Sequence, residues 1–232
     1  MPLQESVVSK ADNPLIKAKK DLDQGNKLKE KGLLAESIAH YQKAIATKPD
    51  YIQALHLLGE VYETQENWSE AVTCYRRIIG LNSSSFSAYI KLARVFKQQN
   101  KVYGAIAAYA EAIELKPDLS AAVYRTYGDL LLQVNDKNPD AIAPYQKAAE
   151  MKQDWGAGFY NKFANLLEKQ GNLVEATKYY LKALSLRGDN PRQYFIVGNI
   201  YFKQGLLKEA AGNYQRAIEL KPDFSNVYKR LG

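Results

Sequence analysis

The stretch at residues 198–222, GNIYFKQGLLKEAAGNYQRAIELKP, constrains the fold of this chain more than any other. Small and aromatic residues recur in it at helical intervals on both sides of a break, with Gly198 and Tyr201 before it and Ala210 and Tyr214 after it. This spacing predicts two closely packed helices, because residues with almost no side chain let two backbones approach. The two tyrosines would then fill the space around that contact.

The same pattern recurs along the chain with a period of about 34 residues, which indicates stacked repeats. The small residue that opens the pattern is Gly25, Gly59, Ala93, Gly128, Ala164 or Gly198. The aromatic residue of the second helix is Tyr41, Tyr75, Tyr109, Tyr145, Tyr180 or Tyr214. Because a lone helix pair cannot cover its apolar sides, we expect neighbouring units to stack.

This pattern resembles the tetratricopeptide repeat, and the resemblance covers about residues 18–232. The resemblance is specific because the marks recur in step in six units, with Pro at three of the unit ends. It implies an all-α fold, a right-handed α-solenoid superhelix of antiparallel helix pairs whose first helices line a concave groove. It also implies a non-catalytic module, since most members of the family bind peptides or proteins in that groove.

We expect a flexible lead at residues 1–12, followed by a repeat array over residues 13–232 that starts with Asn13 as a helix cap and Pro14 at the first helical position. The units should lie at about 18–51, 52–85, 86–120, 121–156, 157–190 and 191–224, with a partial unit at 225–232. The fourth unit should be the least regular. One residue is inserted between its helices, and Pro144 follows Pro139 at the start of its second helix, where we expect a lost hydrogen bond and a bend.

The composition is that of a folded, soluble protein. Of the 232 residues 46% are hydrophobic, yet no run approaches the roughly 18 consecutive apolar residues of a membrane helix. No signal-peptide pattern opens the sequence, and the single Cys74 cannot form an intramolecular disulfide. We therefore expect a cytoplasmic protein without a membrane partner.

The net charge of +7 admits an acidic protein, a nucleic acid or an anionic membrane as a partner, and selects none of them. Seventeen tyrosines among basic residues suit base stacking. The register, however, places thirteen of them at packing positions, Tyr228 among them. We therefore expect no nucleic-acid binding.

No motif for catalysis, a metal or a nucleotide accompanies the repeats. His40 and His56 lie in different predicted helices, and neither has a ligand partner four residues on. Gly156 and Gly158 follow no predicted strand and lack the third glycine of a dinucleotide-binding loop. We expect no catalytic residue, no metal, no cofactor and no enzyme activity in these residues.

The family register places polar residues on the groove wall that the first helices form. In the first two units this wall is mixed or acidic, and it includes Glu60 and Glu63. From the third unit onward basic residues dominate, against only Asp129 and Glu168. The residues that we expect to line the peptide groove are Lys91, Arg94, Lys97, Arg125, Asn161, Lys162, Asn165, Arg192, Asn199 and Lys203.

Such a wall would attract an acidic segment through charge-assisted hydrogen bonds, and its asparagine amides could both donate to and accept from a peptide backbone. A solvent-facing groove is also polar for solubility alone, so one polar residue does not identify a ligand contact. Some relatives hold the C-terminal carboxylate of a chaperone with a set of residues that is incomplete here, because Ile196 stands where Asn is expected. We therefore do not predict chaperone-tail binding.

Three functions remain open. We favour a non-catalytic protein-interaction module that binds an extended, acidic peptide or partner loop in the groove. An alternative is the substrate- or partner-recruiting arm of a larger enzyme, such as a glycosyl- or sulfotransferase, whose catalytic domain would lie beyond residue 232. A third is self-association, in which the last residues, with Val227, Tyr228 and Leu231, stack on another copy.

Overall fold

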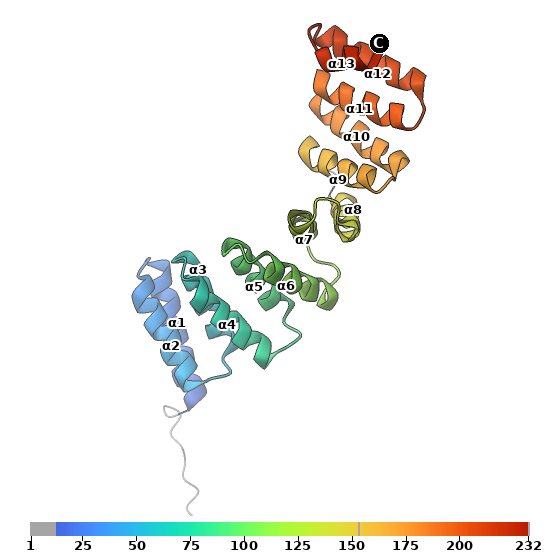
Figure 1. Ribbon diagram of the computed structural model, residues 1–232. Coiled ribbons are helices and arrows are strands. Elements are labelled where there is room, and N and C mark those ends of the chain that lie inside the picture. Colours follow the sequence, from blue (N-terminus) through green and yellow to red (C-terminus); the bar gives the residue numbers. More distant parts are fainter. Residues whose placement is uncertain (1–12, 153, 232) are drawn as a thin grey trace, which may run out of the picture. The chain divides into compact units, whose positions relative to one another are not determined.

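The protein is described by a computed structural model for residues 13–152 and 154–231, without the side chain of residue 231. The expected flexible lead at residues 1–12 lies outside the described residues. The described residues contain α-helices joined by short turns, and no strand (Figure 1). In chain order the helices are α1 (Pro14–Glu30), α2 (Leu34–Thr47), α3 (Ile52–Thr64), α4 (Trp68–Leu81), α5 (Phe86–Gln98), α6 (Val102–Leu115), α7 (Ala121–Val134), α8 (Ile142–Met151), α9 (Ala157–Lys169), α10 (Leu173–Arg187), α11 (Pro191–Lys203), α12 (Leu207–Leu220) and α13 (Ser225–Leu231).

The chain forms two compact units, Met1–Asp118 and Leu119–Gly232. In the first unit α1 packs on α2, α3 on α4 and α5 on α6, and each pair also contacts the next. In the second unit α7 packs on α8, α9 on α10 and α11 on α12, and α13 lies against α12. The expected all-α solenoid of antiparallel helix pairs is therefore confirmed.

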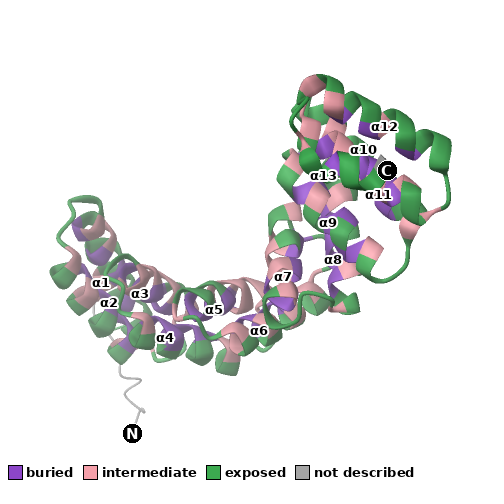
Figure 2. Cartoon of the chain, turned by 45° about the horizontal axis from the view of Figure 1, so that its top comes forward, coloured by how far each residue is buried: buried purple, intermediate pink, exposed green. Residues whose placement is uncertain are grey.

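A glycine against a tyrosine ring joins the two helices of a pair. A methyl group at Gly198 would lie 2.5 Å from the ring of Tyr214, and one at Gly59 would lie 2.8 Å from the ring of Tyr75. Both distances are shorter than a carbon–carbon contact allows, so the rings can approach only because the glycines have no side chain. Buried residues recur along each helix pair (Figure 2). The close packing expected from residues 198–222 is thus confirmed.

In five of the six helix pairs, the turn between the two helices has left-handed backbone at one residue. Glycine supplies it at Gly32, Gly171 and Gly205, with φ of 75°, 81° and 76°. Glu66 and Asn100 adopt the same conformation, with φ of 59° and 56°. Asparagine tolerates this region well, whereas glutamate is strained there by about 1 kcal/mol.

The fourth pair is the least regular, as expected. Its second helix is divided into a 3₁₀ turn, η2 (Pro139–Ala141), and α8, which has 10 residues. The Asn138 side chain caps the turn by accepting a hydrogen bond from the Asp140 backbone N–H at 3.0 Å. The expectation that Pro144 costs a backbone hydrogen bond within one continuous helix was wrong. Pro144 is the third residue of α8, in the first turn of the helix, where backbone N–H groups have no α-helical partner in any case.

Helix ends and buried rings test further predictions. Asn13 caps α1 as predicted, because its Oδ1 accepts a hydrogen bond from the Leu15 N–H at 2.9 Å. The six second-helix tyrosines are buried, and the most exposed of them, Tyr109 and Tyr180, are 4% exposed. Tyr228 is 50% exposed, so the prediction that it packs in the core was wrong.

None of the described helices is long and apolar enough to cross a bilayer.

Aromatic side chains form a cluster in the second unit, between α8, α9 and α10. The rings of Trp155 and Phe159 lie 5.0 Å apart between centroids, and those of Phe163 and Tyr179 lie 4.4 Å apart. The Trp155 indole also donates a hydrogen bond to the Ala148 carbonyl at 2.9 Å. Large rings therefore fill the core beside the shortened helix α8.

Candidate functional site

In the first unit, ion pairs join the first helices of successive pairs. Glu60 of α3 accepts hydrogen bonds from Lys29 of α1 at 3.1 Å and from Lys91 of α5 at 3.0 Å. Burial opposes the charged form of Glu60, but the hydrogen bonds from Lys91 and Lys29 outweigh it and lower the pKa of its carboxyl. These residues line a hollow of about 440 Å³ together with Glu63 and Arg94.

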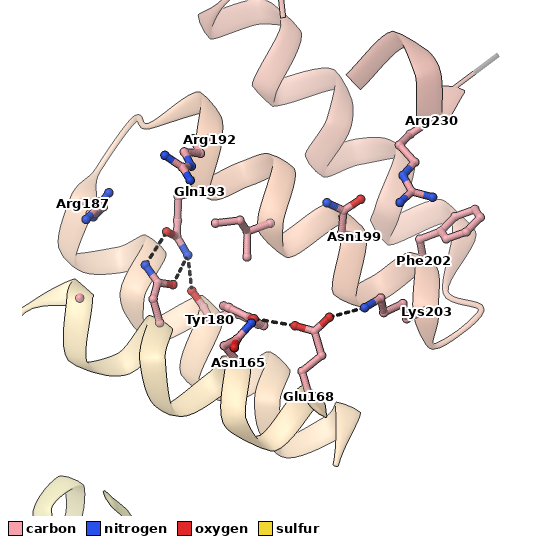
Figure 3. A pocket seen from close by; sticks show the side chains of 13 residues that line it. Asn165, Glu168, Tyr180, Arg187, Arg192, Gln193, Asn199, Phe202, Lys203 and Arg230 are labelled. Carbon is pink, nitrogen blue, oxygen red and sulfur yellow. Dashed lines mark hydrogen bonds and ion pairs between the residues drawn. The ribbon is translucent and has the colours of Figure 1, made fainter. Parts of the chain in front are cut away.

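The second unit uses the same kind of link. Asp129 of α7 meets the ammonium of Lys162 of α9 at 2.6 Å, and the Arg125 guanidinium at 3.6 Å. Glu168 of α9 meets the ammonium of Lys203 of α11 at 2.5 Å (Figure 3). Each carboxylate is therefore held by a cation from the neighbouring repeat.

Tyrosine hydroxyls add a second contact to this wall. In five of the six pairs, the tyrosine of the second helix donates its hydroxyl hydrogen bond to the first helix of the same pair. Burial raises the pKa of Tyr75, Tyr145 and Tyr180, and their carboxylate partners raise it further, so the hydroxyls remain donors. The donor–acceptor pairs are Tyr41–Asn26, Tyr75–Glu63, Tyr145–Asp129, Tyr180–Glu168 and Tyr214–Asn199.

Many of the predicted groove residues are therefore engaged within the protein. The cations with an acidic partner are Lys91, Arg125, Lys162 and Lys203. The amides are also used: Asn161 and Gln193 exchange two hydrogen bonds of 2.9 and 2.8 Å, and Asn165 interacts with the Tyr180 hydroxyl. Gln193 is 1% exposed, so this amide pair belongs to the core as well as to the wall.

Three of the predicted cations, Arg94, Lys97 and Arg192, have no ion pair or hydrogen bond from their side chains to any described residue. Arg94 lines the hollow of the first unit, while Lys97 is exposed on α5 outside it. Arg192 belongs to a larger hollow in the second unit.

The larger hollow has a volume of about 660 Å³ and is lined mainly by α9 and α11, with further residues from α10 and α13 (Figure 3). It brings together five predicted residues: Asn161, Asn165, Arg192, Asn199 and Lys203. Two further lining residues, Arg187 and Gln193, were not among our predicted groove residues. Gln193 is the third residue of a first helix, and Arg187 ends a second helix, outside the positions that the repeat register assigns to the groove.

Three arginines, Arg187, Arg192 and Arg230, border this larger hollow without an acidic partner in the described part of the chain. Arg230 of α13 lies over the Phe202 ring, with its guanidinium carbon 5.8 Å from the ring centroid. A guanidinium stacked in this way keeps its N–H groups free for a carboxylate or phosphate. The hollow therefore combines unpaired positive charge with an amide-lined wall.

Groups suited to other chemistry are engaged or buried. His40 contacts Asp21 at 3.0 Å, and burial lowers the pKa of His56. Burial raises the pKa of the Cys74 thiol to about 11, which disfavours the reactive thiolate. Within residues 13–152 and 154–231, no three His, Cys, Asp or Glu side chains are grouped to hold a metal ion.

Family models described as a tetratricopeptide repeat match residues 56–120, 90–157 and 157–190, and one described as a TPR repeat matches residues 25–66 and 198–232. No curated protein sequence matches the chain. The crystal structure of YrrB, described as a TPR protein with an unusual peptide-binding site, is 17% identical with a TM-score of 0.64, and covers 82% of this chain and 96% of its own.

Two further solved structures share the fold. PilF from Pseudomonas aeruginosa is 18% identical with a TM-score of 0.54, over 94% of this chain and 98% of its own. MamA is 18% identical with a TM-score of 0.59, over 74% of this chain and 92% of its own.

Proposed function

Since the chain belongs to the tetratricopeptide repeat family, we propose that this protein-interaction module binds an extended acidic peptide or partner loop along its first helices. The observation that carries the proposal is the set of three arginines, Arg187, Arg192 and Arg230, around the hollow of the second unit. Their charges are not neutralised by any described acidic side chain. A carboxylate from a partner would supply that neutralisation through charge-assisted, bidentate hydrogen bonds.

The amides of the same wall suit a peptide. Asn165 is exposed at the hollow, and Asn199 accepts from the Tyr214 hydroxyl while keeping its own N–H₂ group as a donor. An amide can pair with the carbonyl or N–H of an extended backbone without reading a side chain. The unusual peptide-binding site described for YrrB, which shares the fold, agrees with a ligand of this kind.

Charge reversal of the three arginines tests the proposal. The variant Arg187→Glu/Arg192→Glu/Arg230→Glu of the intact chain should lose partner capture in an unbiased pull-down at about 0.15 M salt. The same partners should also leave the wild-type chain as salt is raised, because exposed charges are screened.

A matched control changes the net charge by the same amount at residues outside the first-helix wall. Lys147, Lys182 and Lys208 are exposed on the second helices α8, α10 and α12. The triple Lys→Glu variant at these positions should retain capture. Equal loss in both triple variants, or undiminished capture by the arginine variant, would show that the hollow is not the binding site.

We also propose that nucleic acid is not the partner. The tyrosines of the second helices are buried by packing, so they cannot serve as stacking platforms for bases. An excess of single-stranded DNA should therefore fail to displace the captured protein. Displacement at constant salt would point to a nucleic-acid ligand.

A further inference from the structure

The pair α5/α6 breaks the tyrosine pattern of the other five. In those pairs the tyrosine hydroxyl finds its acceptor one or four residues after the small residue that faces the ring. In α5 the small residue is Ala93, and these two positions are Arg94 and Lys97. Neither side chain can accept a hydrogen bond. Tyr109 is thus the one second-helix tyrosine whose two standard acceptor positions are both basic.

Tyr109 carries a buried ring with an unused hydroxyl. The residue is 4% exposed, and its hydroxyl has no hydrogen-bond partner in the described part of the chain. Among the described residues, the solvent-inaccessible side-chain polar atoms that lack a hydrogen-bond partner are Ser37 Oγ and Gln99 Oε1. The Tyr109 hydroxyl oxygen also lacks a partner but is not one of them, so solvent reaches it. Burial raises the pKa of Tyr109, and the nearby Arg94 charge acts in the opposite direction. The Tyr109 hydroxyl is therefore a solvent-accessible hydrogen-bond donor that feels the positive charge of Arg94.

The two cations at the standard acceptor positions of this pair are also unused. Arg94 and Lys97 are exposed and have no acidic partner among the described side chains. Lys91, on the same helix, already contacts Glu60 and Glu63. Arg94 borders the hollow of the first unit, which gives a ligand a route to this position.

In the second unit, a tyrosine hydroxyl and a lysine together bind one carboxylate. Asp129 accepts the Tyr145 hydroxyl at 2.5 Å and the Lys162 ammonium at 2.6 Å. Glu168 is held by a tyrosine hydroxyl and a lysine in the same way. In both cases one carboxylate occupies the space between a phenol donor and a basic side chain. The pair α5/α6 has the donor and the cations but lacks the carboxylate.

We infer that Tyr109, Arg94 and Lys97 form a subsite for an Asp or Glu carboxylate of the bound peptide. The ligand would supply the acceptor that the protein itself supplies in the other five pairs. This inference rests on the proposed function and names the chemistry that the first unit recognises. The subsite lies wholly in the first unit, apart from the arginines of the second unit.

A short fluorescein-labelled oligoglutamate is the probe, and oligoglutamine of the same length is its control. The titration uses the intact chain with Arg187, Arg192 and Arg230 changed to Gln, so that the second unit does not mask the first. In this background Tyr109→Phe should weaken oligoglutamate binding by about tenfold, since a hydrogen bond to a charged group is lost. Arg94→Gln should weaken it at least as much.

Two further variants separate binding from folding. Tyr41→Phe removes a hydroxyl that already has an acceptor, Asn26, and should change oligoglutamate affinity by less than about twofold. Arg94→Asp places a carboxylate beside Tyr109, as Asp129 stands beside Tyr145, and should abolish binding while the chain stays folded by circular dichroism. A merely structural role for Tyr109 predicts instead that Tyr109→Phe and Tyr41→Phe change oligoglutamate affinity equally little.

The inference is overturned if Tyr109→Phe binds oligoglutamate like Tyr41→Phe, or if the background with Arg187, Arg192 and Arg230 changed to Gln does not prefer oligoglutamate to oligoglutamine. Intact partner capture in the pull-down together with either result leaves the proposed function standing and removes only the subsite. Tyr109-dependent oligoglutamate binding without any captured protein removes the proposed function and leaves the subsite.

Discussion

Asp129 and Glu168 of the second unit each meet a tyrosine hydroxyl and a lysine, and Glu63 of the first unit does the same with Tyr75 and Lys91. The first unit differs at Glu60, which lies between lysines from two neighbouring first helices. The unpaired cations differ as well: in the first unit Arg94 and Lys97 occupy the two acceptor positions of the α5/α6 pair, and in the second unit three arginines border the hollow. The glycine–tyrosine contacts are alike in both units. The two units therefore share a scaffold and present different binding chemistry.

Each unit also contains one of the two tryptophans of the chain, Trp68 in the first and Trp155 in the second. Trp68→Phe leaves a fluorescence signal from the second unit, and Trp155→Phe leaves one from the first. Denaturation of these two single-tryptophan backgrounds can therefore follow the unfolding of each unit separately.

The largest effect should come from the contact that the units share. Gly59→Ala in the first unit and Gly198→Ala in the second should each lower the free energy of unfolding of that unit by roughly 1–3 kcal/mol, because the new methyl group meets a buried ring. Chemical denaturation in the matching single-tryptophan background measures the change.

Gly212 is the matched control, since a methyl group there meets nothing within 4 Å. Gly212→Ala should raise the stability of the second unit by about 0.5–1 kcal/mol through helix propensity. If the variants at the tyrosine-facing glycines behaved in the same way, the rings would not determine the helix spacing.

The next largest effect should be a loss of stability in the second unit alone, because the amide pair between Asn161 and Gln193 belongs to that unit. Asn161→Ala leaves polar atoms of Gln193 without their partner, which should cost the second unit about 1–2 kcal/mol and leave the first unit unchanged. Tryptophan-detected denaturation checks both units. The double variant Asn161→Ala/Gln193→Leu should recover part of the loss, and a larger loss in it would contradict this explanation.

A smaller effect of opposite sign in the two units is expected at the turns. Glu66→Gly should stabilise the first unit by about 1 kcal/mol, because glycine adopts a positive φ without strain. Gly205→Ala at the corresponding turn should destabilise the second unit by a similar amount. Thermal unfolding followed by tryptophan fluorescence in the matching single-tryptophan background measures each shift, and equal signs would exclude strain as the cause.

The smallest effect is a pH dependence confined to the first unit, which holds both histidines of the chain. Burial lowers the folded-state pKa of His56 below 6.5, so acidification favours the unfolded, protonated form. The first unit should therefore lose stability as the pH falls from about 6.5 through the lowered pKa. His56→Gln should flatten this slope in denaturation curves, and an unchanged slope would contradict it.

Glu60 extends the same trend to lower pH. Its folded-state pKa lies below the ordinary 4.5, so its contribution is present above pH 4.5 and is lost as the pH falls through the lowered value. The carboxylate is 36% exposed, and solvent screening keeps its contribution below about 1 kcal/mol. Glu60→Gln should remove this acid-dependent loss.

The sequence predicted the fold well because the residues that define the repeat are those that pack. Gly59 and Tyr75, or Gly198 and Tyr214, lie at fixed spacings within one helix pair, and local periodicity is enough to bring them together. Tyr228 was placed wrongly: the register continues into α13, but there Val227 is buried and Tyr228 beside it is half exposed.

The candidate site was only partly predictable. Lys91, Lys162 and Lys203 were assigned to the first-helix wall, but their acidic partners lie 31, 33 and 35 residues away in the chain. Whether such pairs form depends on how successive helix pairs stack, which periodicity within a pair does not determine. A count of basic residues therefore overstated the positive charge that is free to meet a ligand.

The glycine–tyrosine contact also limits how such a chain can diverge. Any side chain added at Gly59 or Gly198 would clash with the ring of Tyr75 or Tyr214, so a substitution there requires that the opposite ring shifts as well. Ala93 and Ala164 show the small step that is tolerated, and their tyrosines are slightly less covered. Wall residues without a partner among the described side chains, such as Arg94, Lys97 and Arg192, carry no such restriction. Repeats copied from one ancestor can thus acquire new ligands while their architecture stays unchanged.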